Sequence, residues 1–372
     1  MLHVHHVNLQ PIVGGGEVYT RALTLALVEA GARVTLYVHP DVALWKGLQA
    51  PGLAVVPCAT ERELLARLPA RALVVTQCPL SQACIDELAA RHVLTGFAHM
   101  PMFQRSPEGF RPFRLVFTVS RYCVDLLRAA GLPQVYPEAV YGTADMARGS
   151  APVRERPLYL LDPQKPRDAL LGRWQQWRAR WRRRPYAPRP GLTLGLVSLI
   201  APIKQFPALF SVLAPRIARY PDVHLEVFGA GGYGQLRDLR RALAPLAGRV
   251  RFWGFQPDVA AVYPLLDYLM TGLPEKEALG LNAIEAQFCG TPVLAPDAPP
   301  FTETVADGAG GFRYRDPRED GGRHFEEILA AIVAGRPRPD PRIAAQDSLA
   351  RFTHAALVER ARRLLGALAA LG

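Results

Sequence analysis

A succession of short apolar strands and helices occurs twice along this chain of 372 residues, and it limits the possible folds more than any other feature. In the first half, an apolar run at 2–9 precedes a helical pattern at 16–30, and a second strand follows at 33–38. The second half begins again with a strand at 192–197 and a helix at 205–218. Short apolar strands separated by helices are typical of parallel sheets covered on both faces. The sequence therefore predicts an α/β fold with two similar domains.

The same pattern supplies further elements and the domain boundaries. The other predicted strands lie at 53–56, 72–76, 93–97, 115–119, 134–136, 224–228, 250–253, 267–270 and 293–295. The other predicted helices lie at 61–68, 82–91, 121–130, 235–246, 258–263, 282–289 and 358–371. The expected divisions are an N-terminal domain at 1–150, a linker at 151–190, a C-terminal domain at 191–350 and a terminal helical segment at 351–372.

Composition excludes several classes of protein. With 49% hydrophobic and 21% charged residues, the chain has enough apolar material for two cores and is not disordered. Its five cysteines form no C-x2-C pair, so neither a zinc site nor a disulfide framework is expected, and the reducing cytoplasm is the favoured location. The N-terminus is not a signal peptide, and no apolar run reaches the 18 residues of a membrane span. No recognisable nucleic-acid module accompanies the net charge of +11, so nucleic acid is not an expected partner.

Two glutamates form the most informative local pattern. Glu277 and Glu285 have seven residues between them and flank a glycine-containing turn at the start of an apolar helix. Backbone amides at a helix N-terminus favour phosphate groups. The amides in question are those of Leu279, Gly280, Leu281 and Asn282. Because an ionised carboxylate only accepts hydrogen bonds, it suits the hydroxyl groups of a sugar or a ribose. The pattern therefore indicates a site for a nucleotide-sugar diphosphate.

Together with the trailing Gly290-Thr291-Pro292-Val293, these glutamates resemble the E-x7-E signature of retaining glycosyltransferases of the GT-B fold, family four, also described as glycosyl transferases group one. The resemblance extends over most of the chain apart from the middle segment. It implies two Rossmann-like domains that face each other across a cleft, with the acceptor on the side of the first and the donor on the side of the second. It also implies that the terminal helix crosses back to the first domain, that Glu277 orients the sugar and that Glu285 binds the ribose.

The resemblance assigns roles to further residues of the second half. Lys204 stands where the family has a lysine that neutralises the diphosphate leaving group. Gly254 and Phe255 follow a predicted strand, and their position suits the pocket of the nucleotide base; a simple turn after the strand is the alternative. Two positions depart from the family pattern, because Leu199 replaces an arginine and Gln205 replaces a glycine. Since a departing diphosphate needs charge stabilisation, the loss of the arginine implies either another cation or weaker phosphate binding.

Two features of the first half also match the family. His99, just after a predicted strand, stands where a histidine contacts the transferred sugar or the leaving phosphate; a structural histidine is the alternative. The glycines Gly14, Gly15 and Gly16 close the first strand, and the equivalent loop of the family faces the donor diphosphate and the acceptor. A dinucleotide fingerprint is not favoured here, because it would require glycine where Tyr19 stands.

The segment 151–190 has no counterpart in the resemblance. Trp174, Trp177 and Trp181 fall on one face of a predicted helix, with arginines such as Arg178 and Arg182 around it. An aromatic face with arginine-rich flanks suits a bilayer surface, which would place the chain at the inner face of the membrane. Packing of the tryptophans onto the protein itself is the alternative.

These features predict a retaining, metal-independent glycosyltransferase without a cofactor, which moves a sugar from a nucleotide sugar to an acceptor glycan or a lipid-linked acceptor such as lipopolysaccharide. No D-x-D metal motif is evident, which agrees with protein cations and amides in place of a metal. Two alternatives on the same fold stay open. One is a nucleotide-sugar epimerase, which turns over without an acceptor. The other is a non-catalytic binding subunit whose phosphate site lacks the arginine at Leu199.

Overall fold

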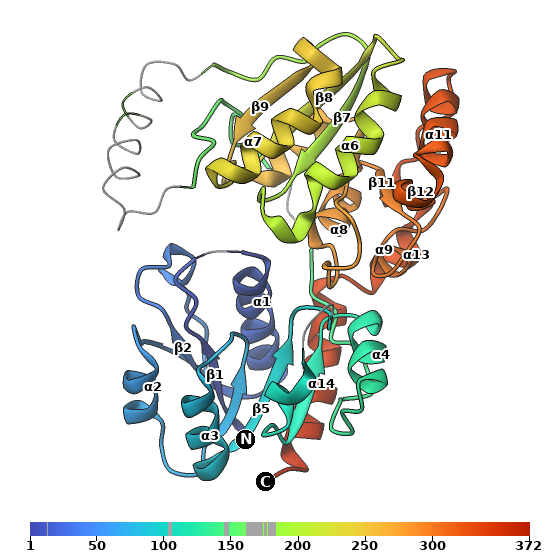
Figure 1. Ribbon diagram of the computed structural model, residues 1–372. Coiled ribbons are helices and arrows are strands. Elements are labelled where there is room, and N and C mark those ends of the chain that lie inside the picture. Colours follow the sequence, from blue (N-terminus) through green and yellow to red (C-terminus); the bar gives the residue numbers. More distant parts are fainter. Residues whose placement is uncertain (13, 103–105, 145–148, 161–173, 175–176, 178–183) are drawn as a thin grey trace. The chain divides into compact units, whose positions relative to one another are not determined.

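The computed structural model describes residues 1–372 apart from 13, 103–105, 145–148, 161–173, 175–176 and 178–183. The chain divides into two compact units, each built on a six-stranded parallel sheet (Figure 1). The first unit comprises Met1–Asp145 and Ala350–Gly372, and the second comprises Met146–Leu349.

The sheet of the first unit has the strand order β3-β2-β1-β4-β5-β6. Its strands are β1 (His3–Asn8), β2 (Arg33–Val38), β3 (Leu53–Pro57), β4 (Leu73–Thr76), β5 (Val93–Ala98) and β6 (Leu115–Thr118). The helices between them are α1 (Gly15–Glu29), α2 (Glu61–Arg67), α3 (Gln82–Arg91) and α4 (Arg121–Ala129), with short 3-10 turns η1 (Ala43–Trp45) and η2 (Pro107–Phe110). Side chains such as Val4, Val74 and Leu94 are completely buried, as expected for strands covered on both faces.

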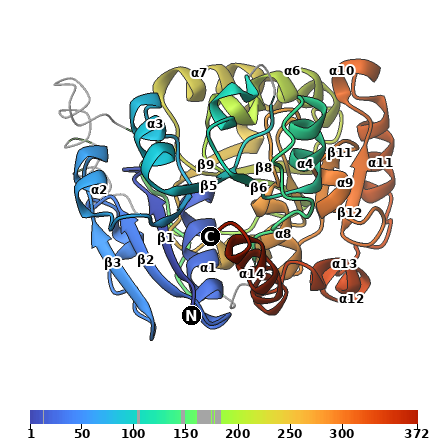
Figure 2. The ribbon, with the colours of Figure 1, turned by 90° about the horizontal axis from the view of Figure 1, so that it is seen from below.

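The last helix of the chain, α14 (His354–Ala369), belongs to the first unit and packs beside α1 (Figures 1 and 2). Leu357, Leu364 and Leu368 are buried along its inner face. His354 Nε2 lies 2.7 Å from a carboxylate oxygen of Glu29 at the end of α1. Apolar packing therefore attaches the C-terminal segment to the N-terminal sheet, with a polar contact at one edge.

One predicted strand of the first unit is wrong. Residues 134–136 form only an isolated parallel bridge, in which Val135 pairs with Val116 of β6. Pro133 and Pro137 flank the bridge, and proline cannot donate a ladder hydrogen bond. The segment therefore contacts the sheet edge without extending it as a strand.

The sheet of the second unit has the order β12-β11-β10-β7-β8-β9. Its strands are β7 (Leu192–Val197), β8 (Val223–Phe228), β9 (Val250–Gly254), β10 (Tyr268–Met270), β11 (Val293–Pro296) and β12 (Gly311–Tyr314). Its helices are α6 (Phe206–Ile217), α7 (Tyr233–Ala242), α8 (Leu281–Phe288), α9 (Phe301–Thr304), α10 (Pro317–Asp320), α11 (Arg323–Val333) and α12 (Pro341–Ala344), while α13 (Gln346–Ala350) leads into the first unit.

Several elements of the second unit differ from the sequence prediction. The helix predicted at 235–246 ends at Ala242 and gives way to the 3-10 segment η4 (Ala244–Arg249), where Pro245 stands near the start. The helix predicted at 258–263 is two 3-10 turns, η5 (Val259–Ala261) and η6 (Tyr263–Leu265), followed by β10. Pro245 and Pro264 explain these differences, because proline lacks the backbone N–H that a continuing helix needs.

Residues near both ends of the segment 151–190 are hydrogen-bonded within the second unit. Arg154 pairs with Pro185 in an antiparallel bridge, and Tyr186 N donates to Val153 O at 2.9 Å. Further along, Gly231 N donates to Leu158 O, and Leu160 N donates to Gly231 O. Both ends of the stretch at 161–183 therefore begin from backbone that is hydrogen-bonded within the second unit.

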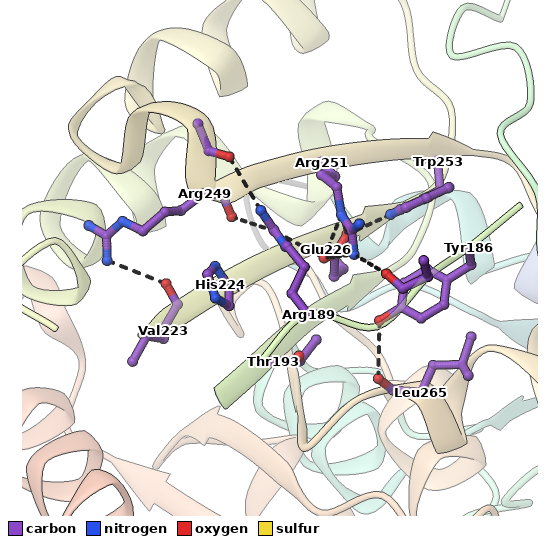
Figure 3. A network of polar contacts seen from close by, with 12 residues as sticks. Tyr186, Arg189, Thr193, Val223, His224, Glu226, Arg249, Arg251, Trp253 and Leu265 are labelled. Carbon is purple, nitrogen blue, oxygen red and sulfur yellow. Dashed lines mark hydrogen bonds and ion pairs between the residues drawn. The ribbon is translucent and has the colours of Figure 1, made fainter. Parts of the chain in front are cut away.

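A buried carboxylate holds the returning end of that segment (Figure 3). Glu226 on β8 is fully buried and forms ion pairs with Arg189 at 3.0 Å and Arg251 at 2.6 Å. The indole Nε1 of Trp253 donates to its other oxygen at 2.6 Å. Arg251 also lies over the ring of Tyr186, at 5.3 Å from the ring centroid. Because a buried charge is tolerated only with such partners, the network fixes Arg189 and the edge strand β9 on β8.

Candidate functional site

The loop after β7 brings Lys204 to the carboxyl edge of the second sheet. It ends in the 3-10 turn η3 (Pro202–Lys204), and Gln205 then adopts a left-handed backbone with φ of 53° before α6 begins. The loop after β10 packs closely on this turn, because a Cβ atom at Gly272 would lie 2.3 Å from the carbonyl oxygen of Lys204. Glycine at 272 is thus what allows the two loops to meet.

Lys204 and Glu277 form an ion pair. Both side chains are largely buried, with exposed fractions of 22% and 16%. The other carboxylate oxygen of Glu277 accepts a hydrogen bond from the amide of Gly280 at 3.2 Å. Glu277 therefore connects the β7 loop to the turn that precedes α8, and the two residues predicted from sequence lie in contact.

The start of α8 is shaped by Gly280 and Asn282. Gly280 has φ of 75°, and a Cβ there would lie 2.9 Å from the ring of Phe301, so both backbone and space require glycine. Asn282 Nδ2 donates to the carbonyl oxygen of Val197 at 3.2 Å, which ties the first turn of α8 to the end of β7. Leu279 is buried and Leu281 is partly exposed. The positive end of the α8 dipole therefore lies at the same sheet edge as Lys204.

Glu285 lies one turn into α8 and is held by a residue that the sequence interpretation did not single out. The hydroxyl of Tyr263 donates to a carboxylate oxygen of Glu285 at 2.6 Å. Burial raises the pKa of Glu285, while the Tyr263 hydrogen bond and the charge of Lys204 lower it. Tyr263 is itself fully buried, and its carbonyl accepts from Thr291 Oγ1 at 2.6 Å. The tyrosine lies outside the glutamate motif, so only the fold brings the two together.

Gly254 and Phe255 lie at the end of β9, on the same carboxyl edge of the sheet. The carbonyl of Gly254 accepts from Gly229 N at 2.9 Å, and a Cβ at Gly254 would lie 2.3 Å from the carbonyl of Arg156. Phe255 has 51% of its surface exposed. In this arrangement Gly254 packs against the backbone of the 151–160 segment, and Phe255 presents an aromatic side chain to the solvent.

The glycine loop lies in the first unit and is organised by Glu17. Gly14 N donates to one carboxylate oxygen of Glu17 at 2.7 Å, and α1 begins at Gly15. Asn8, at the end of β1, donates to the other oxygen of Glu17 at 3.4 Å, and Thr20 Oγ1 donates to Gly16 O at 2.7 Å. The amide of Gly14 thus has an internal carboxylate partner, which accounts for the tight turn.

His99 follows β5 in the first unit and is connected to neighbouring strands. Its Nε2 lies 2.5 Å from Gln77 Oε1, and Gln77 Nε2 lies 2.7 Å from Nε2 of His6 on β1. Burial lowers the pKa of His99 to about 4, so the ring is neutral near pH 7. Sequence reasoning found His99 but not Gln77, whose polar side chain has no local motif to distinguish it.

The predicted aromatic helix lies mostly outside the described residues. Trp174 and Trp177 are helical, with exposed fractions of 51% and 60%. Trp181, Arg178 and Arg182 are outside the described residues. In the part of the chain that the structure describes, no helix is long and apolar enough to span a membrane. Those residues likewise include no group of three or more histidine, cysteine, aspartate or glutamate side chains suited to a metal ion.

Part of the second unit matches a known protein family. Residues 191–331 match the family described as glycosyl transferases group 1. The match covers the strands β7 to β12 of the second unit. The matched residues include Lys204, Glu277, Glu285 and Tyr263, so the contacts described above lie within the part of the chain that matches this family.

The curated relatives align with this chain over only part of their own length. A phosphatidyl-myo-inositol mannosyltransferase of Mycolicibacterium smegmatis is 32% identical over 127 residues, which are 33% of this chain and 32% of the relative. A D-inositol 3-phosphate glycosyltransferase of Stackebrandtia nassauensis is 34% identical over 189 residues, which are 46% of this chain and 41% of the relative. The chain thus matches less than half the length of either relative.

Solved structures match the whole chain in fold. Anabaena HepE, crystallised with UDP and glucose, has a TM-score of 0.69 at 18% identity and covers 98% of this chain and 100% of its own. Sucrose-phosphate synthase of Thermosynechococcus elongatus also has a TM-score of 0.69, at 17% identity, with full coverage of both chains. The two parallel six-stranded sheets are those of the GT-B fold, as the sequence predicts.

Proposed function

We propose that this chain transfers a sugar from a nucleotide sugar to an acceptor with retention of configuration and without a metal ion. The observation that carries the proposal is the contact set at the carboxyl edge of the second sheet. There the ammonium group of Lys204 forms an ion pair with Glu277, and Glu285 lies about one turn from the N-terminus of α8. A cation and helix-end amides suit a diphosphate, while two carboxylates suit hydroxyl groups.

In the proposed reaction, each charged group has a separate task. Lys204 leaves Glu277 to pair with the diphosphate as negative charge develops on it, and the amides of the turn before α8 add to this stabilisation. Glu277 then accepts hydrogen bonds from the sugar, and Glu285 accepts from the ribose. The acceptor oxygen forms a bond to the anomeric carbon on the face from which the diphosphate departs. The acceptor proton passes to a diphosphate oxygen, so no strong protein base is needed.

The acceptor is proposed to be a polyol or a lipid-linked glycan. Two relatives are named for inositol-containing acceptors, and one of these is a phosphatidylinositol mannosyltransferase. Exposed Trp174 and Trp177 favour a peripheral position at the cytoplasmic face of a membrane. The test is flotation with anionic liposomes of a variant in which Trp174, Trp177 and Trp181 are changed to serine. We expect flotation to be lost; flotation equal to that of the parent chain would exclude the membrane role.

The donor site is tested by thermal stabilisation with a panel of nucleoside diphosphates and nucleotide sugars. We expect one base to raise the Tm of the parent chain, and Glu285→Gln to abolish that shift. Glu327→Gln, an exposed change on α11, is the matched control and should bind like the parent. A shift that persists in Glu285→Gln would refute the ribose role of Glu285. No shift with any nucleotide would favour the non-catalytic binding subunit, since Leu199 supplies no charge.

A further inference from the structure

A chain of four hydrogen bonds runs through the buried interior of the first unit to His99. Gln77 contacts His99 at 2.5 Å and His6 at 2.7 Å. His6 Nδ1 lies 2.7 Å from Thr24 Oγ1 on α1, and Thr24 Oγ1 donates to the carbonyl oxygen of Thr20 at 2.7 Å. His6 and Thr24 have no exposed surface, so these groups depend on one another for partners.

The carbonyl of Thr20 fixes the direction of every bond in this chain. A carbonyl oxygen only accepts, so the Thr24 hydroxyl gives its single proton to Thr20. Thr24 Oγ1 must then accept from His6 Nδ1–H, which leaves His6 Nε2 as an acceptor. Gln77 therefore directs its NH2 group to His6 and its oxygen to His99. In the opposite orientation, the oxygen of Gln77 would accept from His6 Nε2–H, and His6 Nδ1 would need a proton from Thr24. Thr24 cannot supply it, because its single hydroxyl proton is donated to Thr20.

The direction of the chain determines which nitrogen of His99 carries the proton. Because Gln77 Oε1 is an acceptor, the partner nitrogen Nε2 of His99 must be protonated. In the neutral ring the other nitrogen, Nδ1, is then a hydrogen-bond acceptor. Edge contact with Tyr19 and stacking on Phe97, with ring centroids 5.1 and 5.8 Å away, hold the plane of the ring. Among the described residues, Nδ1 has no hydrogen-bond partner.

We propose that Gln77, oriented by His6 and Thr24, is a positioning residue that keeps the proton of His99 on Nε2, so that Nδ1 accepts a hydrogen bond from a hydroxyl group of a sugar or polyol. This inference rests on the proposed glycosyl transfer for the identity of the ligand. It also distinguishes between the two ligands considered for His99. A nitrogen lone pair accepts from a hydroxyl group, whereas a phosphate oxygen has no proton to offer it near pH 7.

The test is the tautomer of His99, measured by nitrogen NMR on the full chain with 15N-labelled histidine at pH 7. In the parent chain, Nε2 of His99 should carry the proton and Nδ1 should not. Thr24→Val removes the hydroxyl while keeping the shape, and Gln77→Leu removes the amide. Both should lower the ratio of the Nε2–H to the Nδ1–H form by roughly tenfold, the effect of one lost hydrogen bond. Thr24 does not touch His99, so a packing role alone would not produce its effect.

The matched control is Gln134→Leu, which removes an amide that donates to Phe110 O elsewhere in the same unit. It should leave the His99 signals unchanged. A parent chain with the proton on Nδ1, or an unaltered tautomer ratio in both Thr24→Val and Gln77→Leu, would overturn the proposal. If Gln77→Leu does not fold, the isosteric Thr24→Val decides the outcome. No nucleotide is present in this experiment, so failure here is separate from failure of the donor site in the second unit.

Discussion

The hydroxyl group of Tyr263 donates a hydrogen bond to Glu285, with 2.6 Å between the two oxygens. Tyr263 lies on η6, before β10, whereas Glu285 lies on α8. Burial raises the pKa of the carboxyl group, and the tyrosine opposes that shift by stabilising the ionised form. Tyr263 thus both orients the carboxylate proposed to bind the ribose and favours its charged state.

The first prediction concerns this hydroxyl group. Tyr263→Phe should weaken binding of the nucleoside diphosphate by about 1–2 kcal/mol, because Glu285 loses a partner that holds it in place. The measurement is titration calorimetry with the nucleotide that stabilises the parent chain. Tyr268→Phe is the matched control, since the buried hydroxyl of Tyr268 has no partner among the described residues. Equal affinity of Tyr263→Phe and the parent chain would contradict the positioning of Glu285 by Tyr263.

The second prediction concerns the missing arginine of the phosphate site. Leu199 is partly exposed in the loop between β7 and Lys204. Leu199→Arg should tighten binding of a nucleoside diphosphate by about 1.5–3 kcal/mol, the usual contribution of a hydrogen bond to a charged group. Val333→Arg adds the same charge on α11 and should change the affinity little. If both variants bind equally well, the gain is general attraction, and Leu199 is not at the phosphate site.

The third prediction concerns the backbone of Gln205. Its φ of 53° lies in the left-handed region, which glycine adopts without strain and a β-branched residue strongly resists. Gln205→Gly should leave the free energy of unfolding within about 1 kcal/mol of the parent, and Gln205→Val should lower it by about 2 kcal/mol more. Denaturant unfolding gives both values. At Gln235, inside α7, the order should reverse, because glycine destabilises a helix more than valine.

The elements that sequence reasoning found are those with long apolar runs or clear end signals. Strands β1, β2 and β7 and helices α1 and α3 lie within a residue or so of their predicted ends. Strand β12 was not predicted, because Gly311 to Tyr314 is short and includes the charged Arg313. Helix α11 was not predicted either, because the preceding Gly321 and Gly322 indicate a break in the chain more clearly than the start of a helix. Local signals were therefore sufficient only where the segment was long or strongly apolar.

The candidate site divides in the same way. Glu277 and Glu285 were predicted because they flank a helix start that is visible in the sequence, and Lys204 was predicted from its place in the family resemblance. Tyr263 and Gln77 were missed, because each acts through contacts with residues more than 20 positions away. Such contacts depend on how strands are ordered in the sheet, which a local pattern does not specify. The role of Gly272 in the close approach of two loops is likewise visible only in the fold.

The fourth prediction concerns the buried carboxylate in Figure 3. Glu226→Gln leaves Arg189 and Arg251 without their shared charge partner inside the second unit. The free energy of unfolding should fall by about 3–5 kcal/mol, the usual cost of an uncompensated buried charge. Denaturant unfolding followed by tryptophan fluorescence suits the measurement, since Trp253 donates to Glu226. Glu327→Gln should change stability by less than about 0.5 kcal/mol; a similar small effect at Glu226 would show that solvent reaches the arginines.

The last prediction concerns the pH dependence of the first unit. Burial lowers the pKa of His6 to about 3 and those of His5 and His99 to about 4, whereas an unfolded histidine has a pKa of 6.5. Below 6.5 the unfolded chain therefore binds protons that the folded chain does not, so stability falls as the pH decreases. Each histidine contributes up to about 1.4 kcal/mol per pH unit between 6.5 and its folded pKa.

Hydrogen exchange at the amides of β1, followed from pH 7 to pH 4.5, measures this loss locally after correction for the intrinsic exchange rate. His6→Gln should reduce the number of protons taken up on unfolding by about one, and so reduce the slope of the free energy of unfolding against pH. The reason is that the change removes one of the three histidines named above. His354→Gln, a change at the partly exposed contact with Glu29, should leave the slope of β1 nearly unaltered. A slope that is the same in His6→Gln and the parent chain would mean that His6 is already protonated in the folded unit. In that case its hydrogen bond from Gln77 would be lost, because a doubly protonated ring has no acceptor.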